Sequence, residues 1–372
     1  MKKFIILAIF AITICLPSLV IANSQPNQPP VPDEYFRAKV NAILEEGQKE
    51  IDGSIQDYQE LSLTILNGVL KDTKITIDHG GLFQIEENQR VSTGDIVVIT
   101  KTMKPDGEPL YYIIDKDRRT GLITATAIFL ALAIFFGRKR GLTSIIGLFL
   151  TVVVIFYGVI PRIAAGGSPF WTSLLGAFAI LITSLYLSHG INKRTTVALI
   201  SSLVSLAIAV GLDFLFVFLA NLNGSGAEEA MYLQFDNTVF DLRQLLLGAI
   251  ILGVLGVLDD VTTGQSATVD EVYKANPNLS KKELYASGMS VGREHIASLI
   301  NTLVLAYVGA AFPLLIFFTT QKNLPLWVII NGSFLAEEII RTLVGSATLV
   351  IAVPITTLIA VNIYTRKKPK QA

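Results

Sequence analysis

The chain has 372 residues, of which 51% are hydrophobic and 16% charged, and its formal net charge at pH 7 is zero. This composition indicates a membrane protein rather than a soluble enzyme, and the neutral balance gives no basic surface for nucleic acid. The single cysteine, Cys15, excludes a disulfide framework, and the three histidines form no metal-binding motif, so we expect no metal and no cofactor.

The N-terminal residues 1–22 have the features of a secretory signal peptide. Lys2 and Lys3 precede an apolar run, and Ala22 supplies the small residue found before a cleavage site. An uncleaved signal anchor is the alternative, because this segment is also long enough to cross a membrane. Residues 23–32 are polar and rich in proline, which predicts a linker. Either form of the signal places the linker and the segment after it outside the cytoplasm.

Residues 33–118 alternate apolar with polar side chains in short runs, which is typical of half-buried strands. Lys104-Pro105-Asp106-Gly107 separates two of these runs and is a strong hairpin signal. Five or six short strands predict a small extracytoplasmic all-β domain of barrel-like form, for which the OB-type barrel is one candidate. The strands carry no basic and aromatic face. We therefore expect a structural or docking domain, with a ligand-binding domain as the alternative.

Residues 119–364 contain seven apolar stretches of about 20 residues, the length that a membrane-spanning helix needs. They lie at 121–137, 141–160, 170–187, 195–220, 244–263, 295–319 and 343–364. Helices are the expected form, because backbone groups in lipid must find their partners within the segment. The fold class is thus a mainly α membrane bundle of seven transmembrane helices, preceded by the all-β domain. The stretch 324–336 is too short to span and is expected to be interfacial or re-entrant.

Basic residues in the short connections predict the orientation of this bundle. Arg138-Lys139-Arg140, Lys193-Arg194 and the tail at 365–372 are basic, whereas the alternate connections are less so. The basic segments, including the C-terminus, are therefore expected in the cytoplasm and residues 23–118 outside it. This agrees with the signal at the N-terminus.

The longest cytoplasmic connection, 264–294, is expected to form an ordered helical hairpin. Two capping boxes begin at Thr268 and Ser280, each with a Glu three residues later, and Pro277 breaks the chain between them. The hairpin and the outer β domain are the two surfaces on which we expect protein partners, besides the lipid bilayer itself.

Polar side chains within the spans are candidate functional residues, because a charge at membrane depth costs about 2.5–3.5 kcal/mol on insertion scales. Asp213 lies in the fourth stretch, where a structural acid bonded to hydroxyls or water is the alternative. Asp260 ends the fifth stretch, and the sixth begins with polar residues on one helix face. If the two spans are neighbours, they form a polar vestibule suited to an ion or proton path, lined by Asp260, His295, Ser298, Asn301 and Thr302. A polar membrane interface is the alternative.

A further charged group, Glu337, Glu338 and Arg341, lies near the outer end of the last span. Glu337 and Arg341 have the favourable order and spacing for an ion pair on one helix. We expect this group to neutralise itself at the membrane interface. The chain contains no P-loop or GxSxG motif, so we do not expect an enzyme.

Several short motifs resemble the YibE/F family of bacterial multipass membrane proteins. They are Gly253-Val254-Leu255-Gly256 leading to Asp260, Asn276-Pro277-Asn278-Leu279-Ser280, Val291-Gly292-Arg293, Asn301-Thr302 and Ala306-Tyr307. The resemblance covers most of the chain and implies a location in the bacterial plasma membrane. The family pattern has an apolar residue at the position of Asp259, which implies that Asp260 is the acid that matters. The family is described as transporter-like.

Together these observations predict a permease or exporter that moves a small solute or ion, with the outer domain as a gate or dock. The alternative is a non-transporting envelope scaffold or accessory subunit that binds other proteins. Two soluble surfaces and the lack of an inverted repeat suit that alternative.

Overall fold

The computed structural model describes residues 34–51, 54–81, 85, 87–104, 107–227, 230, 232–233, 241–320 and 324–365. Two compact units are present, with the division between residues 132 and 133. The signal or anchor predicted at 1–22, the linker at 23–32 and all but the first residue of the basic tail lie outside the described residues.

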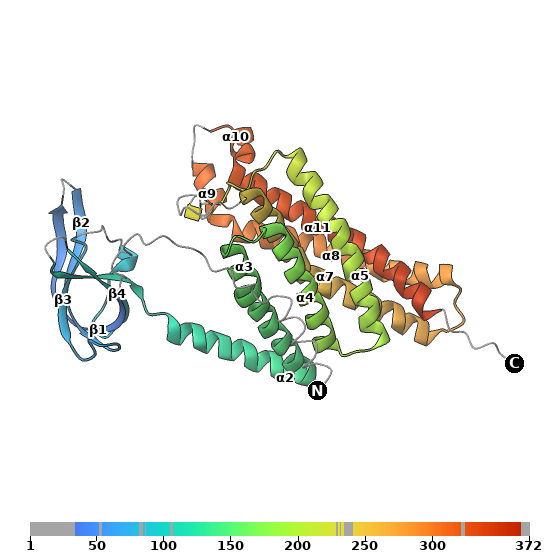
Figure 1. Cartoon of the computed structure of the whole chain (residues 1–372), viewed down its shortest axis with the longest axis horizontal. Coiled ribbons are helices and arrows are strands. Elements are labelled where there is room, and N and C mark those ends of the chain that lie inside the picture. Colours follow the sequence, from blue (N-terminus) through green and yellow to red (C-terminus); the bar gives the residue numbers. More distant parts are fainter. Residues whose placement is uncertain are drawn as a thin grey trace. The chain divides into compact units, whose positions relative to one another are not determined.

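The first unit contains one antiparallel sheet of five strands, drawn in blue and teal in Figure 1. The strands are β1 (Glu34–Ile51), β2 (Ser54–Ile65), β3 (Lys74–His79), β4 (Ile96–Met103) and β5 (Pro109–Lys116), in the order β3-β2-β1-β4-β5. A short 3-10 helix, η1 (Glu87–Gln89), lies between β3 and β4. The long strand β1 pairs with β2 on one side and with β4 on the other, and two bulges interrupt its pairing with β2. The antiparallel β unit predicted from alternation is confirmed.

The core of this unit consists mainly of the alternate apolar residues of β1, β2 and β4, with Ile77 of β3 packed among them. Ala38, Val40, Leu61, Leu63, Ile65, Val97 and Ile99 are all fully buried. Arg37 forms an ion pair with the buried carboxylate of Asp117, at 2.6 Å, and this ties the chain that leaves β5 back to β1. The strands are therefore held both by packing and by a charged contact at the exit of the sheet.

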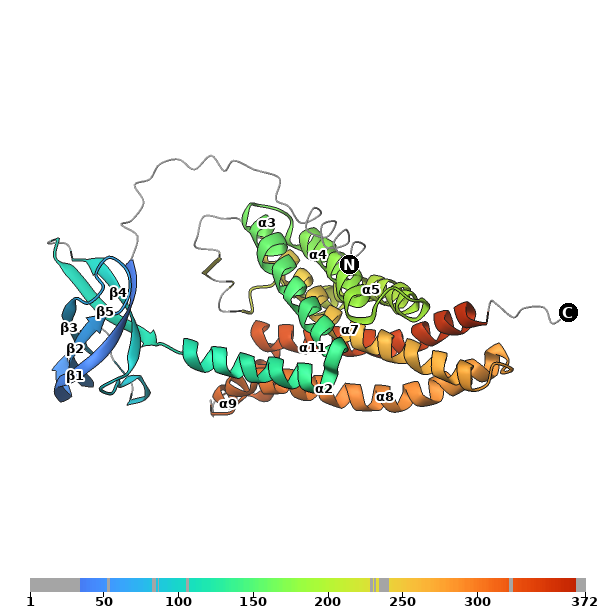
Figure 2. The same ribbon diagram turned by 90° about the horizontal axis from the view of Figure 1, so that it is seen from below.

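The second unit is helical (Figures 1 and 2). Its elements, with the helix that runs across the division, are α2 (Arg119–Val153), the π-helical segment η2 (Val154–Val159), α3 (Ile160–Ala164), α4 (Pro169–His189), α5 (Lys193–Leu219), α7 (Leu242–Ala275), α8 (Lys281–Ala310), α9 (Phe312–Thr320), α10 (Leu326–Asn331) and α11 (Ser333–Tyr364). Within the described residues, five helical runs are long and apolar enough to cross a membrane: Arg119–Ala164, Pro169–His189, Lys193–Leu219, Leu242–Ala275 and Ser333–Tyr364.

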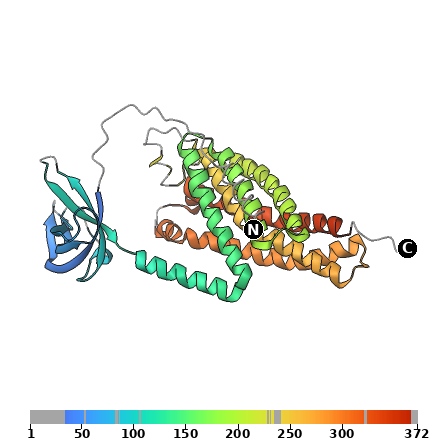
Figure 3. The ribbon, with the colours of Figure 1, turned by 60° about the horizontal axis from the view of Figure 1, so that its bottom comes forward.

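The first two predicted spans fall within a single run of 46 residues, so seven separate spans are not confirmed. This run bends sharply at Arg138, where φ is 51° and ψ is −129° (Figure 3). Gly141 permits the bend: a Cβ placed on it would lie 2.0 Å from the carbonyl oxygen of Ala133. The helix thus changes direction within the basic segment Arg138-Lys139-Arg140 that was expected to be a connection.

The predicted sixth span, 295–319, is divided between α8 and α9. The break falls at Ala311, and Pro313 is the second residue of α9. Proline lacks an amide proton and is favoured in the first turn of a helix, so it starts a new helix here. The polar residues at the start of the predicted span also keep α8 out of the set of apolar spans.

Three helices form the centre of the helical unit, because α5, α7 and α11 pack against one another. α4 packs on α7, and α8 lies along α7 and α11 (Figure 2). Gln265 of α7 joins three of these helices: its amide donates to the carbonyl of Gly288 in α8, at 2.9 Å, and to Oγ1 of Thr357 in α11, at 2.8 Å. The helical core is therefore mainly apolar, and polar contacts such as those of Gln265 connect the helices within it.

The connection between α7 and α8 agrees with one of the two predicted capping boxes. At Ser280 both bonds are formed, since the Ser280 amide donates to Oε2 of Glu283 and the Glu283 amide donates to the Ser280 hydroxyl. The box predicted at Thr268 is wrong: α7 continues through it to Ala275. The Thr268 hydroxyl donates instead to the carbonyl of Gly264, as it does inside a continuous helix.

Candidate functional site, an acidic cavity between α2, α4 and α7

A cavity of about 300 Å³ lies between α2, α4 and α7 in the helical unit. Its apolar wall comes from leucine and isoleucine side chains of all three sides, and Ile155 of the π-helical segment belongs to it. Its polar lining consists of Ser144, Thr151, Ser184, Ser188, His189, Asp259 and Asp260. Carboxylate and hydroxyl oxygens therefore face the same space, and π-helical turns are often found at functional sites.

Asp259 is the half-buried acid of this cavity. Its Oδ2 accepts a hydrogen bond from the Ser184 hydroxyl, at 3.1 Å. Its Oδ1 is buried and has no hydrogen-bond partner among the described residues. Asp260 lines the same cavity and is exposed. The family pattern pointed to Asp260 alone, whereas the structure brings both carboxylates to one site.

Hydrogen bonds between helices fix the rotation of α7 at this level. The Thr262 hydroxyl lies 2.7 Å from that of Ser202 in α5 and donates to the carbonyl of Leu258. On the other side of the cavity, α2 approaches α4 closely at Gly147, where a Cβ would lie 3.0 Å from Oγ of Ser188. The sequence signals for this wall are the hydroxyl pairs Ser184 and Ser188 of α4, and Ser144 and Thr151 of α2. These signals do not identify the wall by themselves, because the sequence does not show which of these helices pack together.

The α8 residues predicted to share a vestibule with Asp260 lie elsewhere. His295, Ser298, Asn301 and Thr302 are all exposed, and none of them lines the acidic cavity. The face of α8 that packs on α7 and α11 carries Leu284, Gly288, Gly292 and Leu303 instead. The absence of side chains at Gly288 and Gly292 allows the close contact, since a Cβ at Gly292 would lie 2.5 Å from Val353. The polar row is thereby turned outward.

Asp213 is fully buried in α5, away from the acidic cavity. Neither of its carboxylate oxygens has a hydrogen-bond partner within the described part of the chain. The hydroxyl partners considered in the sequence analysis are therefore not found there. A buried polar group without a partner is costly, so this acid needs an explanation beyond packing.

The charged group of α11 is divided between two partners. Glu338 pairs with Arg341, one turn later. Glu337 is 4% exposed and accepts a hydrogen bond from the amide of Gly226, at 2.9 Å. The expected pairing of Glu337 with Arg341 is therefore replaced by that of Glu338, because Glu337 faces the connection after α5.

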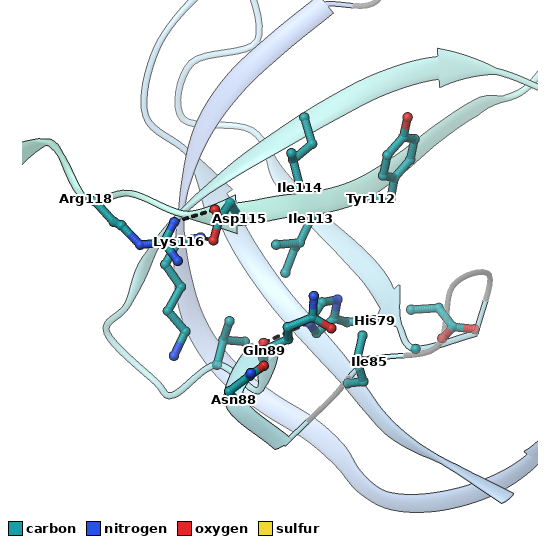
Figure 4. Close-up of a pocket in the computed structure, with 13 residues that line it drawn as sticks. His79, Ile85, Asn88, Gln89, Tyr112, Ile113, Ile114, Asp115, Lys116 and Arg118 are labelled. Carbon is teal, nitrogen blue, oxygen red and sulfur yellow. Dashed lines mark hydrogen bonds and ion pairs between the residues drawn. The ribbon is translucent and has the colours of Figure 1, made fainter. Parts of the chain in front are cut away.

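A second cavity, of about 700 Å³, lies in the β unit beside β3, β5 and η1 (Figure 4). His79 lies in its wall with its ring nitrogen Nε2 3.2 Å from the carbonyl of Gln89, as the dashed line in Figure 4 marks. Burial lowers the pKa of His79 below its ordinary value of 6.5. On the other side, Asp115 pairs with Arg118, and this arginine lowers the pKa of that carboxyl. The lining of this cavity is mixed, with apolar side chains such as Ile113 beside the charged side chains of Asp115, Lys116 and Arg118.

The acidic cavity offers oxygen ligands and a carboxylate that is only half satisfied. Such a set can hold a small cation or exchange a proton. It does not form a closed metal site, since the described residues contain no group of three or more His, Cys, Asp or Glu side chains placed to hold a metal ion.

Comparison with known proteins identifies the relatives of the chain. The family model described as YibE/F-like protein matches residues 125–366, which include every wall of the acidic cavity. No curated protein and no solved structure matches the chain. The family match covers more than half of the chain, and the protein therefore belongs to the YibE/F family.

Proposed function

We propose that this protein is a permease or exporter that moves a small cation, or a small solute together with protons, through its helical unit. The observation that carries the proposal is the acidic cavity, in which Asp259 and Asp260 line one space with four hydroxyl groups. Carboxylates at membrane depth are costly to keep, and they commonly mark ion or proton paths. The partly unsatisfied Asp259 supports a role beyond packing.

Asp213 is a second acidic residue of the helical unit, and it lies at a different level from Asp259 along the axes of α5 and α7. Ser202 and Thr262 are bonded side chain to side chain and mark one level of the antiparallel helices α5 and α7. Asp213 is eleven residues beyond Ser202 and Asp259 is three residues before Thr262. At 1.5 Å per residue, Asp213 lies about 12 Å further along the helix axis than Asp259. Two acids at different depths suit stepwise movement across a membrane.

The proposal is tested by ion flux into vesicles that contain the full chain. Proteoliposomes that contain a pH dye or, in parallel preparations, an indicator for Na⁺, K⁺ or Mg²⁺ are given gradients of these cations and of protons in turn. Wild type is expected to dissipate at least one gradient, and Asp259→Asn and Asp260→Asn are expected to slow that flux at least about tenfold, because each removes a charge that the cavity presents to the cation. Asp213→Asn is expected to slow it as well.

Glu294→Gln is the matched control, because Glu294 is an exposed acid of α8 outside the cavity. Thermal unfolding midpoints of all variants establish that the bundle is intact. Equal fluxes in wild type and in both cavity variants would reject the proposal, as would a Glu294→Gln variant that loses as much flux as they do.

The scaffold function is kept as a second candidate because of the exposed polar row on α8, formed by His295, Ser298, Asn301 and Thr302. Polar side chains on membrane helices commonly bond across to another helix. A photoreactive amino acid at position 301, introduced in the native host, is expected to capture a protein partner if the scaffold function holds. The same probe at the exposed position 300, on a different face of α8 from the polar row, is the control. Capture at neither position argues against this candidate.

We infer that the β unit is an OB-type barrel. Its strand order is that of a five-stranded barrel opened between its two end strands, and β3 packs beside β5 at that opening. The cavity of Figure 4 lies at the same place and gives the outer domain a docking position. Cross-linking of the full chain through a photoreactive residue at Tyr112 tests this role, with the exposed Tyr35 as the control position. Equal capture at both positions would contradict it.

A further inference from the structure

A third cavity, of about 540 Å³, lies at the end of the helical unit where α4 ends and α5 begins. Four cationic side chains line it: Arg140, Lys193, Arg194 and Lys274. The one carboxylate in its wall is Asp270, and His189 is the remaining titratable residue. The cavity is therefore basic, in contrast to the acidic cavity that shares His189 with it.

Two of the four cations are already paired. Asp270 lies 3.0 Å from Nη2 of Arg194 and 2.7 Å from Nζ of Lys274, and Glu271, just outside the wall, pairs with both. Arg140 and Lys193 have no carboxylate within ion-pair distance in the described residues. Lys193 lies over the ring of Tyr364, at 5.2 Å from its centre. The wall thus carries two cations whose charge the described residues do not neutralise.

The start of α5 adds neutral donors to these charges. Asn192 caps the helix by accepting the amide of Thr195, at 2.9 Å, while the amides at the first positions of a helix have no partner within it. Thr195 provides a second observation, independent of the helix N-terminus. It lines the cavity and is only 2% exposed, and its hydroxyl has no hydrogen-bond partner among the described residues. A buried hydroxyl without a partner beside unneutralised cations points to an anionic ligand.

We propose that this cavity binds a phosphate group. Helix N-termini, arginine and lysine are the groups that proteins use to hold phosphate, and here they converge with a free hydroxyl on one space. A carboxylate ligand would use fewer of these donors than the several oxygens of a phosphate. The phosphate belongs either to the headgroup of an anionic lipid, as in basic pockets between membrane helices, or to a soluble phosphate compound.

The experiment uses the full chain and two probes. In the first arm the protein is held in nanodiscs of phosphatidylcholine with or without phosphatidylglycerol, and bound lipid is counted by native mass spectrometry. In the second arm inorganic phosphate is added to lipid-free protein in detergent, and the thermal midpoint is compared with that in chloride at equal ionic strength. Selective retention of phosphatidylglycerol assigns the site to lipid, and a phosphate-specific rise of the midpoint assigns it to a soluble phosphate.

Variants locate the binding. Arg140→Gln and Lys193→Gln are expected to weaken binding about tenfold each, the size of one charge-assisted hydrogen bond. Thr195→Val keeps the shape and is expected to weaken it several-fold. Lys139→Gln removes the same charge next to Arg140 but outside the wall, and is expected to bind as wild type does. Binding of neither probe, or equal weakening by Lys139→Gln and Arg140→Gln, would overturn the proposal.

Discussion

Glu337 of α11 accepts a hydrogen bond from the backbone amide of Gly226, and the two residues are 111 positions apart in the chain. The contact is close as well as polar: a Cβ placed on Gly226 would lie 2.7 Å from Cδ of Glu337 and 2.8 Å from the backbone of Ser333. Gly226, in the connection after α5, therefore packs directly against the first turns of α11.

Gly226→Ala is therefore expected to destabilise the helical unit by about 1–3 kcal/mol, the usual cost of forcing an extra methyl group into a packed contact. The midpoint of thermal unfolding in detergent measures the loss. Gly211→Ala is the matched control, because a Cβ there meets nothing within 4 Å. A midpoint for Gly226→Ala equal to that of Gly211→Ala would show that this contact is looser than described.

Gln265 is expected to contribute to stability through two partners at once. Gln265→Leu leaves the Thr357 hydroxyl without its donor, and the loss is expected to be about 1–3 kcal/mol. A double-mutant cycle with Thr357→Val isolates the bond between the two side chains, and a coupling of about 1 kcal/mol is expected. A coupling of zero would mean that the two side chains act independently.

The connection between α7 and α8 yields a paired prediction. Ser280→Ala removes a helix cap and is expected to cost about 1 kcal/mol. Thr268→Ala removes a hydroxyl that bonds only within its own helix, and is expected to change stability by less than about 0.5 kcal/mol. Urea unfolding of the two variants, followed by circular dichroism, distinguishes them. A larger loss of stability for Thr268→Ala than for Ser280→Ala would instead support a helix start at Thr268, as the sequence motif there predicts.

The bend of α2 is expected to depend on Gly141. A methyl group at this position would meet the carbonyl oxygen of Ala133, so Gly141→Ala is expected to open the bend or to lower the yield of folded protein. Distances between spin labels at two exposed positions, 136 and 146, measured by electron paramagnetic resonance, report the angle. Gly137→Ala has open space around its Cβ and is the control. If the distance between the two spin labels is unchanged in Gly141→Ala, the bend of α2 does not depend on Gly141.

His79 is expected to make the β unit sensitive to mild acid. Burial lowers its pKa in the folded unit, so the unfolded chain binds the proton more tightly. The stability that this difference contributes is fully present above about pH 6.5, the ordinary pKa of histidine, and falls as the pH drops through and below that value. Hydrogen exchange of the β3 amides in the full chain, corrected for intrinsic rates, measures it.

His79→Gln is expected to remove this dependence. The carboxyl group of Asp57 acts in a separate pH range. Arg90 lowers its pKa, so the stability that it contributes is lost only as the pH falls below the ordinary value of 3.8. The same acid sensitivity between pH 7 and 5 in His79→Gln would assign the effect to another group.

The strands and most of the helix boundaries could be predicted because they depend on local patterns. Ala38 and Val40 alternate with polar neighbours, and Ser280 with Glu283 marks a helix start wherever the chain is free to begin one. The buried face of α8 could not be predicted in this way. It is decided by two missing side chains, Gly288 and Gly292, and by what α7 and α11 present to them.

The acidic cavity was predicted only in part for the same reason. The place of Asp260 at the end of a span indicates a candidate functional acid, but its neighbours depend on which helices pack together. Ser184 lies 75 residues from Asp259 in the chain, and no local pattern relates the two. Local patterns identify which side chains are costly to bury, whereas tertiary packing determines which of them meet.

The two bonds of Gln265 also restrict how the helical unit can change shape. Because one buried amide joins α7 to both α8 and α11, separating any of these three helices leaves hydrogen-bonding groups stranded in the interior. On the other side of the acidic cavity, α4 meets α7 through separate side-chain bonds among the described residues: the Ser184 hydroxyl donates to Asp259, and the Ser168 hydroxyl donates to Gln244. An opening that exposes Asp259 by moving α4 over α7 would break these two separate bonds but would leave the junction of α7, α8 and α11 intact.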